Sequence, residues 1–155
     1  MIIRRVNSGD IRDINKLLYQ LEDVHAELRP DIFKPNTKKY SDKELAELIE
    51  DYTRPAFAAT EGEKILGYVF CKIKRQTDNP ILKAVKTLYI ENICVDESAR
   101  KAGVGTALYE HVIDFAKAEK CYNVTLKVWS DNKSAVNFYE SLGLTPRQIT
   151  FEKII

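Results

Sequence analysis

The sequence lacks the cysteine and histidine patterns that mark metal and disulfide proteins. Its three cysteines, Cys71, Cys94 and Cys121, form no C-x-x-C pair, and their odd number leaves no complete disulfide framework. We therefore expect three small buried side chains in place of a zinc or dithiol site. The only histidines, His25 and His111, are far apart in the sequence. No metal site is predicted.

Long apolar runs and an excess of one charge are missing as well. No stretch approaches the roughly 18 consecutive apolar residues of a membrane span, and residues 1–5 (MIIRR) lack the apolar core of a signal peptide. The chain carries 24 basic and 23 acidic residues, a formal net charge of +1. Nucleic-acid binding needs a basic surface that this balance does not indicate. We expect a cytoplasmic protein that binds neither membrane nor nucleic acid.

What is present is typical of an ordinary globular protein. The 155 residues are 45% hydrophobic and 30% charged. A chain of this length buries enough surface to fold without disulfides and suits one domain. No internal repeat, low-complexity segment or flexible linker divides it. We therefore expect a single domain over residues 1–155.

Hydrophobic periodicity predicts an α/β (α+β) fold. Apolar residues recur at helical spacing in four segments, 11–25, 41–52, 104–119 and 135–142. Strand-like segments are 2–6, 56–60, 65–74, 86–95, 123–129 and 148–155, with a further turn at 76–80. The strands between 56 and 95 read as an antiparallel meander. The next strand follows a crossover helix, so it should join the sheet in parallel.

One stretch, residues 90–108, organises the chain. An apolar strand ends at a polar turn, and the segment Arg100–Gly105 then opens a helix with two glycines and two cations. The first N–H groups of a helix have no intrahelical partner, and the helix dipole adds partial positive charge there. Glycine also lets a ligand approach the backbone closely. The segment Arg100–Gly105 is therefore predicted to be a phosphate cradle.

Two motifs carry a family resemblance. The cradle, RKAGVG, has the pattern Q/R-x-x-G-x-G/A, and residues 131–143 (DNKSAVNFYESLG) resemble N-x-x-A-x-x-F-Y-x-x-x-G. Both are signatures of the GCN5-related N-acetyltransferases (GNAT), and they occur in the family's order on matching elements. Leu144 stands where the family commonly has phenylalanine and remains apolar. The resemblance implies a GNAT-like domain with a mixed, mostly antiparallel twisted sheet flanked by helices and a splayed central strand pair.

The resemblance also implies an acyl-CoA-dependent acyltransferase that uses acetyl-CoA and no metal. Backbone N–H groups of the cradle would hold the pyrophosphate, and the central strand would pair with the pantetheine arm. The side chains of Arg100 and Lys101 either add charge or are simply solvated, and Asn132 either bonds the pantetheine or caps a helix. The residues expected to bind the cosubstrate are Ile93, Cys94, Val95, Arg100, Lys101, Ala102, Gly103, Val104, Gly105, Thr106, Asn132 and Tyr139.

The implied chemistry is direct attack of a neutral amine on the thioester in a ternary complex. The Val95 backbone N–H is the candidate donor to the developing oxyanion. Tyr139 matches the tyrosine that often protonates the departing thiolate, and its ordinary pKa near 10 keeps it protonated at neutral pH. A core tyrosine with a satisfied hydroxyl is the alternative.

Glu91 is the candidate base-associated residue. Its position resembles that of a glutamate in diamine acetyltransferases, and the two-residue period of a strand places it on the same face as Val95. A surface-facing glutamate is the alternative. Weaker candidates for the acceptor pocket are Tyr89, Asn92, Phe33 and Tyr68.

Two other interpretations assign the sequence to a different class of protein. A dinucleotide-binding domain is disfavoured because Leu108 replaces the third glycine of G-x-G-x-x-G. A noncatalytic acyl-CoA sensor stays open as an alternative to an enzyme acting on a small-molecule or peptide amine. The family resemblance also implies a homodimer.

Overall fold

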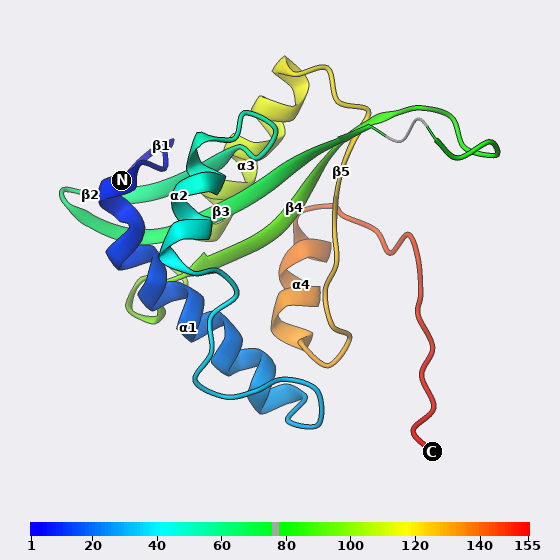
Figure 1. Ribbon diagram of the computed structural model, residues 1–155, viewed down its shortest axis with the longest axis horizontal. Coiled ribbons are helices and arrows are strands. Elements are labelled where there is room, and N and C mark those ends of the chain that lie inside the picture. The colour runs from blue at the N-terminus through cyan, green and yellow to red at the C-terminus, as the bar shows by residue number, and fades with distance from the viewer. Residues whose placement is uncertain (76–77) are drawn as a thin grey trace.

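The computed structural model describes residues 1–75 and 78–155, and it shows a mixed five-stranded sheet flanked by helices (Figure 1). The strands are β1 (Ile2–Arg5), β2 (Ala56–Glu61), β3 (Lys64–Arg75), β4 (Lys86–Val95) and β5 (Asn123–Leu126). The helices are α1 (Ile11–Leu28), α2 (Asp42–Glu50), α3 (Val104–Ala118) and α4 (Lys133–Ser141), with short 3-10 turns at Ser8–Asp10 and Glu97–Ala99. Strand order is β1-β2-β3-β4-β5, antiparallel except for the parallel pair β4–β5. The predicted fold class is confirmed.

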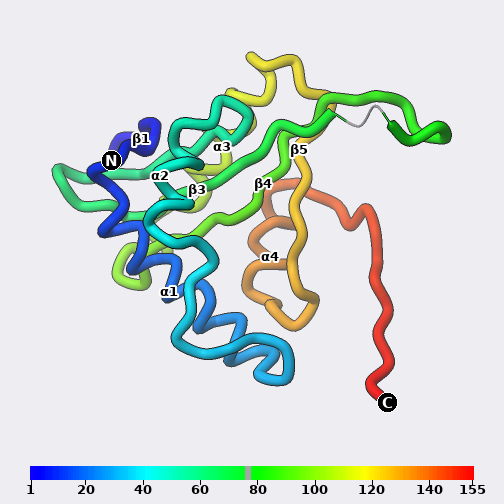
Figure 2. Tube along the Cα trace, in the orientation of Figure 1, coloured from blue at the N-terminus to red at the C-terminus, as the bar shows by residue number. Residues whose placement is uncertain are grey.

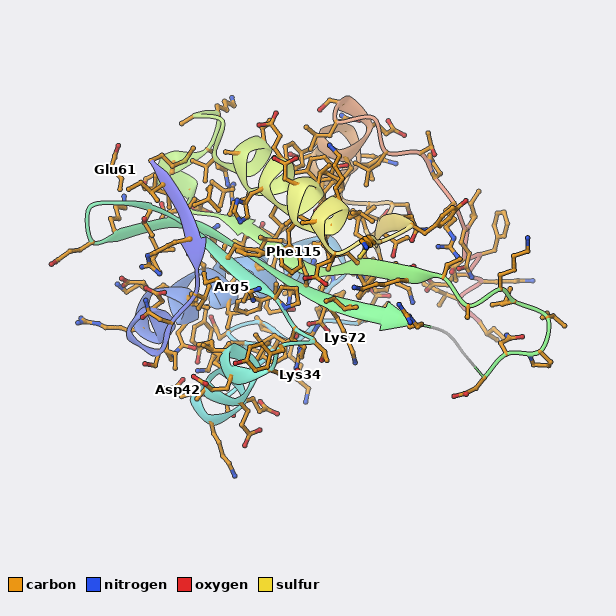
Figure 3. All side chains as sticks on the ribbon, turned by 90° about the horizontal axis from the view of Figure 1, so that it is seen from above. Arg5, Lys34, Asp42, Glu61, Lys72 and Phe115 are labelled. Carbon is orange, nitrogen blue, oxygen red and sulfur yellow. The ribbon has the colours of Figure 1, made fainter. Side chains whose placement is uncertain are left out.

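The sheet is packed between two helical layers. Figure 3 shows α3, with Phe115, on one side of the sheet and α2, with Asp42, on the other. One apolar cluster joins the α3 face, including Leu108, to strand residues such as Val69. The second joins α1 and α2 to the opposite face, where Tyr68 and Phe70 are fully buried. Each face of the sheet is thus sealed by its own helices.

Local sequence signals mark the helix ends. Ser41 and Glu44, three residues apart, form a capping box at the start of α2. Asn7 and Asp10 form another before α1. Gly143 follows α4 with φ of 86°, a left-handed conformation that glycine adopts readily and that ends the helix. Short-range sequence patterns therefore set the helix boundaries well.

A β-bulge in β4 overturns one prediction. Phe70 pairs with Asn92 while Cys71 pairs with Ile90, so Glu91 is an extra residue in β4. Val95 packs with the cluster on the α3 face, whereas Glu91 bonds to a residue beside α2 on the opposite face. The expectation that Glu91 and Val95 share a face is wrong, because a bulge interrupts the two-residue alternation.

The central strands diverge after the bulge. β5 pairs with β4 only from Thr87 to Ile90 and ends at Leu126, so the predicted strand to residue 129 is too long. Residues 91–95 of β4 have no strand neighbour on that side within the described chain. Figure 1 shows β5 and the segment after it running away from β4, with α4 beside them. The predicted splayed pair is present.

The C-terminal segment differs from the prediction. Residues 148–155 form no strand, and Figure 2 shows them leaving α4 as an extended trace. Their residues are all exposed. Of the predicted turn at 76–80, residues 76 and 77 lie outside the described residues. Among the helices described, none is long and apolar enough to cross a membrane.

Candidate active site

The cradle adopts the conformation that an anion site requires. Lys101 and Gly103 have φ of 63° and 78°, both left-handed, and α3 begins directly after them. Left-handed residues thus alternate with ordinary ones here, and this alternation turns successive backbone N–H groups toward one concave side. Gly103 is the N-cap and offers no side-chain acceptor, and in the described chain the N–H groups of 101–106 donate no hydrogen bond. The backbone is therefore available to bind phosphate.

Gly105 draws three elements of the site together. A Cβ at this position would lie 3.1 Å from Cζ of Phe138 on α4 and 3.6 Å from Cγ2 of Val95 at the end of β4. The missing side chain thus lets the first turn of α3 approach both. The cradle, β4 and the helix that carries Tyr139 meet at this point.

The end of β4 presents backbone groups to the side that β5 has left. The Asp96 N–H donates to Leu66 O at 2.8 Å, on β3. In an antiparallel pair, every second residue directs its N–H and C=O to the neighbouring strand. Counting back from Asp96, the backbone groups of Cys94 point to β3, and those of Ile93 and Val95 point away from it. The Val95 N–H therefore points away from β3, and outside the strand ladders it donates no hydrogen bond to a described residue. Ile93 and Val95, more than Cys94, fit the predicted backbone role.

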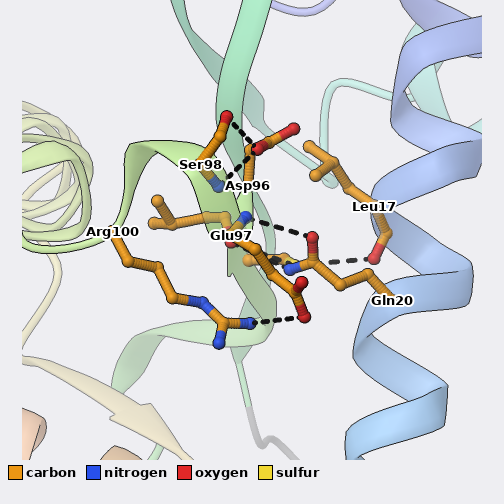
Figure 4. A network of polar contacts seen from close by, with 8 residues as sticks. Leu17, Gln20, Asp96, Glu97, Ser98 and Arg100 are labelled. Atoms are coloured by element: carbon orange, nitrogen blue, oxygen red, sulfur yellow. Dashed lines mark hydrogen bonds and ion pairs between the residues drawn. The ribbon is translucent and has the colours of Figure 1, made fainter.

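Gln20 on α1 braces this strand end, as Figure 4 shows. Its Nε2 donates to Val95 O at 2.9 Å and to the Cys94 Sγ at 3.4 Å, and its Oε1 accepts from the Glu97 N–H at 3.2 Å. Arg100 forms an ion pair with the same Glu97, its Nη2 lying 3.7 Å from Glu97 Oε1. Sequence reasoning missed Gln20, because no local pattern marks a contact across some 75 residues.

Cys94 is a core residue. Its side chain is buried, and its Sγ donates to Leu17 O at 3.5 Å. Burial raises the pKa of the Cys94 thiol to about 12. The thiol therefore stays protonated at neutral pH and is no nucleophile.

Tyr139 is placed to hold a proton beside β4. It is half-buried on α4, and burial, followed by the nearby Cys94 thiol, raises the pKa of its phenol well above the ordinary value. No hydrogen bond to its hydroxyl is found among the described residues, so the alternative of a satisfied core tyrosine is not favoured. Asn132 caps α4 through Oδ1, which accepts from the Ala135 N–H at 3.1 Å. Its amide nitrogen is left for another partner.

Glu91 is ion-paired, which sequence reasoning did not foresee. Arg54 Nη2 lies 2.7 Å from Glu91 Oε2 and 3.2 Å from the Tyr40 hydroxyl. Burial lowers the pKa of Arg54. The hydrogen bond and charge attraction to Glu91, together with smaller contributions from Tyr40, outweigh burial, so the net pKa is raised. The Glu91 side chain is 13% exposed, so it is not the surface glutamate of the alternative reading.

Three buried polar atoms on this face of the sheet have no partner in the described chain. They are Arg54 Nε, the Tyr68 hydroxyl and Asn92 Nδ2. Asn92 pairs with Phe70 beside the bulge, and Tyr68 lies two residues earlier on β3. Leaving a buried donor unpaired costs about 1–3 kcal/mol, so these atoms mark places that an ordered water or a polar ligand atom would occupy. Tyr68 and Asn92, weak candidates from the sequence, are brought together here.

The other weak candidates lie elsewhere. The Lys74 ammonium sits 3.7 Å from the centre of the Tyr89 ring. Phe33 stacks on His25 and meets Trp129 edge-on, at centroid distances of 4.9 and 5.4 Å. Neither contact touches the bulge.

An acidic cavity adjoins the Glu91–Arg54 pair. Its volume is about 260 Å³, and it is lined by Tyr40, Glu44, Glu47, Leu48, Asp51 and Arg54. The carboxylates give it a negative rim that favours a cationic amine. In residues 1–75 and 78–155, no three His, Cys, Asp or Glu side chains come together as a metal site.

Comparison with known proteins identifies the family. The model of the acetyltransferase (GNAT) family matches residues 21–144. N-alpha-acetyltransferase 30 of Homo sapiens is 29% identical over 140 residues, 90% of this chain but 37% of that protein. Ribosomal protein bS18-alanine N-acetyltransferase of Escherichia coli K12 is 31% identical over 101 residues, 63% of this chain and 67% of that protein. The chain thus spans little more than a third of the human relative.

Solved structures agree on the fold. A tetramutant of the BH1408 protein from Bacillus halodurans superposes with a TM-score of 0.95 at 28% identity, covering 100% of both chains. The aminoglycoside acetyltransferase meta-AAC0020 from an uncultured soil metagenomic sample gives 0.75 at 18% identity, covering 99% and 95%, which shows likeness of fold alone. With the family model matching most of its length, the chain belongs to the GNAT family of acetyltransferases.

Proposed function

We propose that residues 1–155 form one cytoplasmic N-acetyltransferase domain that moves an acetyl group from acetyl-CoA to a primary amine. The observation that carries the proposal is the cradle of unpaired N–H groups joined, through Gly105, to the strand end that β5 has left. Anion binding and a backbone-lined opening meet at one place. That is the arrangement a phosphate-bearing thioester needs.

The residues present fit acetyl-CoA. The N–H groups of residues 101–106 suit the pyrophosphate, and the backbone of Ile93 and Val95 suits the amides of the pantetheine arm. Asn132 keeps one amide nitrogen for the same arm. When bound, acetyl-CoA supplies an acyl group already activated as a thioester. The protein then has only to orient the amine, stabilise charge and manage protons.

Val95 and Tyr139 take the two charge-handling roles in this proposal. The unpaired Val95 N–H donates to the carbonyl oxygen as negative charge develops there, which contributes on the order of 3 kcal/mol to the transition state. The Tyr139 phenol, kept protonated by burial, gives its proton to the departing sulfur. Gln20 holds Val95 in place through the strand's carbonyl oxygen.

Glu91 attracts and orients the amine in this proposal, and a water molecule relays the proton to it. Its pairing with Arg54, at 2.7 Å, fixes the carboxylate beside the bulge. Replacing it as Glu91→Gln should lower kcat/KM at neutral pH and shift the pH profile of the rate upward. A loss of folding stability with an unchanged profile would mark Glu91 as structural.

The α-amine of a peptide is the acceptor class we propose to test first. Both curated relatives bear the names of N-terminal or alanine N-acetyltransferases, and the acidic cavity suits a cationic amine. Small-molecule amines follow as the second class. We also propose that the enzyme works as a homodimer.

A noncatalytic acyl-CoA sensor is the second candidate. The observation that favours it is the Glu91–Arg54 ion pair, which occupies the carboxylate nearest the bulge. The test is incubation of the full chain with acetyl-CoA and a panel of peptides and small amines, followed by mass spectrometry. Gain of one acetyl group on an amine supports the enzyme, whereas acetyl-CoA binding with no modified amine supports the sensor.

A further inference from the structure

The helical cover of the sheet stops partway along β3. On the face toward α1 and α2, Phe70 is fully buried, but the next two side chains on that face, Lys72 and Lys74, are exposed. Ile73, between them, packs with the cluster on the α3 face, so both lysines point the other way. In Figure 3, Lys72 lies on the side of the sheet away from Phe115. Beyond Phe70, this face of the sheet is open.

The two neighbouring strands extend the open face. Tyr89 of β4 pairs with Lys72 on one side and with Thr125 of β5 on the other. Leu88 and Ile90, which flank Tyr89 in the sequence, are buried in the cluster on the α3 face. Tyr89 therefore points to the open face together with its cross-strand partners.

The open face is positively charged. The Lys74 ammonium lies 3.7 Å from the centre of the Tyr89 ring, and Lys127, just after β5, is near enough for its charge to act on Lys74. Burial, followed by the like charge of Lys72, lowers the pKa of Lys74, which Glu91 raises and Lys127 lowers again, so the net pKa is lowered. Within residues 1–75 and 78–155, none of these three lysines forms an ion pair. We call Lys72, Lys74, Lys127 and Tyr89 the lysine face.

The lysine face continues from the place proposed for the amine. Glu91, the bulge residue, is two residues from Tyr89 in β4, and its carboxylate binds Arg54 on the same side of the sheet. At ~3.3 Å per strand residue, Tyr89 lies about 7 Å and Thr87 about 13 Å along β4 from Glu91. In an extended peptide, the third and fourth residues lie roughly 7 and 10 Å from the first. A peptide that follows β4 away from Glu91 therefore carries these residues over the lysine face.

We propose that the acceptor is a peptide with an acidic third or fourth residue, whose carboxylate is bound by Lys72, Lys74 and Lys127 while its amine lies at Glu91. This acceptor class rests on the proposed acetyltransferase function and narrows its peptide substrates. The charges match in order, since the ammonium at the start of the peptide meets a carboxylate and the later carboxylate meets ammonium groups. A peptide with lysine or arginine at the same positions is repelled.

Tyr89 acts as a positioning residue within the lysine face. Its ring holds the Lys74 ammonium over β4 through a cation–π contact, which orients the charge without neutralising it. Tyr89→Leu removes the ring and should lower the preference for an acidic peptide about threefold. Tyr89→Phe keeps the ring and should keep the preference. Equal preferences in these two variants would overturn the positioning role.

Matched peptides test the lysine face with the full chain. The peptides share their first two residues and their last two, and carry Glu-Glu, Gln-Gln or Lys-Lys at positions three and four, with alanine, serine or methionine first. CoA release and product mass give kcat/KM for each. We expect the Glu-Glu peptide to exceed the Gln-Gln peptide at least ~10-fold, mainly through KM, and the Lys-Lys peptide to be poorest. The preference should shrink as salt is raised from ~0.05 to ~0.5 M, because counterions screen exposed charges.

A matched pair of variants assigns the preference to the lysines. Lys72→Gln/Lys74→Gln should bring the ratio of kcat/KM for the Glu-Glu and Gln-Gln peptides close to one. The ratio is measured on one enzyme preparation, so a loss of folded protein cancels from it. Lys117→Gln/Lys120→Gln removes the same charge from exposed positions at the end of α3, on the other side of the sheet, and should keep the wild-type ratio.

The possible failures are distinguishable. Equal kcat/KM for the Glu-Glu and Gln-Gln peptides, or a preference that survives in Lys72→Gln/Lys74→Gln, overturns the lysine face and leaves the acetyltransferase standing. Acetylation of small amines but of no peptide overturns the peptide acceptor and the lysine face together. No acetylated product from any amine overturns the proposed function itself.

Discussion

Removing the hydroxyl of Tyr139 isolates its proposed role as the acid. Tyr139→Phe keeps the ring, which lies 5.3 Å from that of Phe138, and deletes one oxygen that has no hydrogen-bond partner in the described chain. Because no bond within the protein is broken, the free energy of unfolding should change by less than about 0.5 kcal/mol. Any effect on the rate can then be assigned to the hydroxyl.

The expected kinetic effect is large and confined to kcat. Positioned proton transfer contributes roughly 10²- to 10⁴-fold, so kcat should fall about a hundredfold or more, equivalent to ~2.7 kcal/mol. The KM for acetyl-CoA should stay within about twofold, since the cradle is untouched. Burial raises the pKa of Tyr139, so the wild-type rate should show no loss from its ionisation as pH rises to about 10.

The assay is release of free CoA, followed with a thiol reagent at saturating acetyl-CoA and a fixed amine. Tyr52→Phe, on a side chain that is 92% exposed, is the control and should match the wild type. If Tyr139→Phe retains more than about half of the wild-type kcat, the acid role is refuted.

Three further predictions concern stability, measured by urea unfolding. Gly67→Ala should cost about 1–3 kcal/mol, because its Cβ would lie 2.7 Å from the backbone oxygen of Cys94; a neutral substitution would contradict the close approach of β3 and β4. Arg54→Met should cost about 1–3 kcal/mol by leaving Glu91 without its cation, and adding Glu91→Met should recover part of that; additive effects would show that the pair is uncoupled. Burial raises the pKa of Cys71 and Cys94 to about 12. The unfolded chain therefore loses these protons first as pH rises above about 9, and stability should fall there by up to ~1.4 kcal/mol per pH unit for each thiol, and not in Cys71→Ala/Cys94→Ala.

The cradle could be predicted from the sequence because the residues that shape it are neighbours in the chain. Two glycines at a helix start and a capping serine before α2 act within a few residues, so their conformations follow from the chain itself. The second motif placed Tyr139 on the helix next to the cradle. The fold class followed from the alternation of strand and helix periods.

Long-range contacts were beyond the same reasoning. The bulge at Glu91 depends on how β3 and β4 pair, and strand alternation read from one sequence carries no mark of it. Gln20 and Arg54 reach the site from 75 and 37 residues away, and neither sits in a recognisable pattern. Residues 148–155 have a strand's sequence but pair with no strand in the described part of the chain, which periodicity alone does not reveal.

Acetyl transfer itself tests the central claim most directly. The purified full chain is mixed with acetyl-CoA and a panel of peptide α-amines, lysine side chains and small amines, and CoA release is measured together with acetylated product. We predict CoA and product in equal amounts for at least one class of amine, with peptide α-amines foremost. Tight binding of acetyl-CoA with no product from any amine would contradict the assignment as an acetyltransferase.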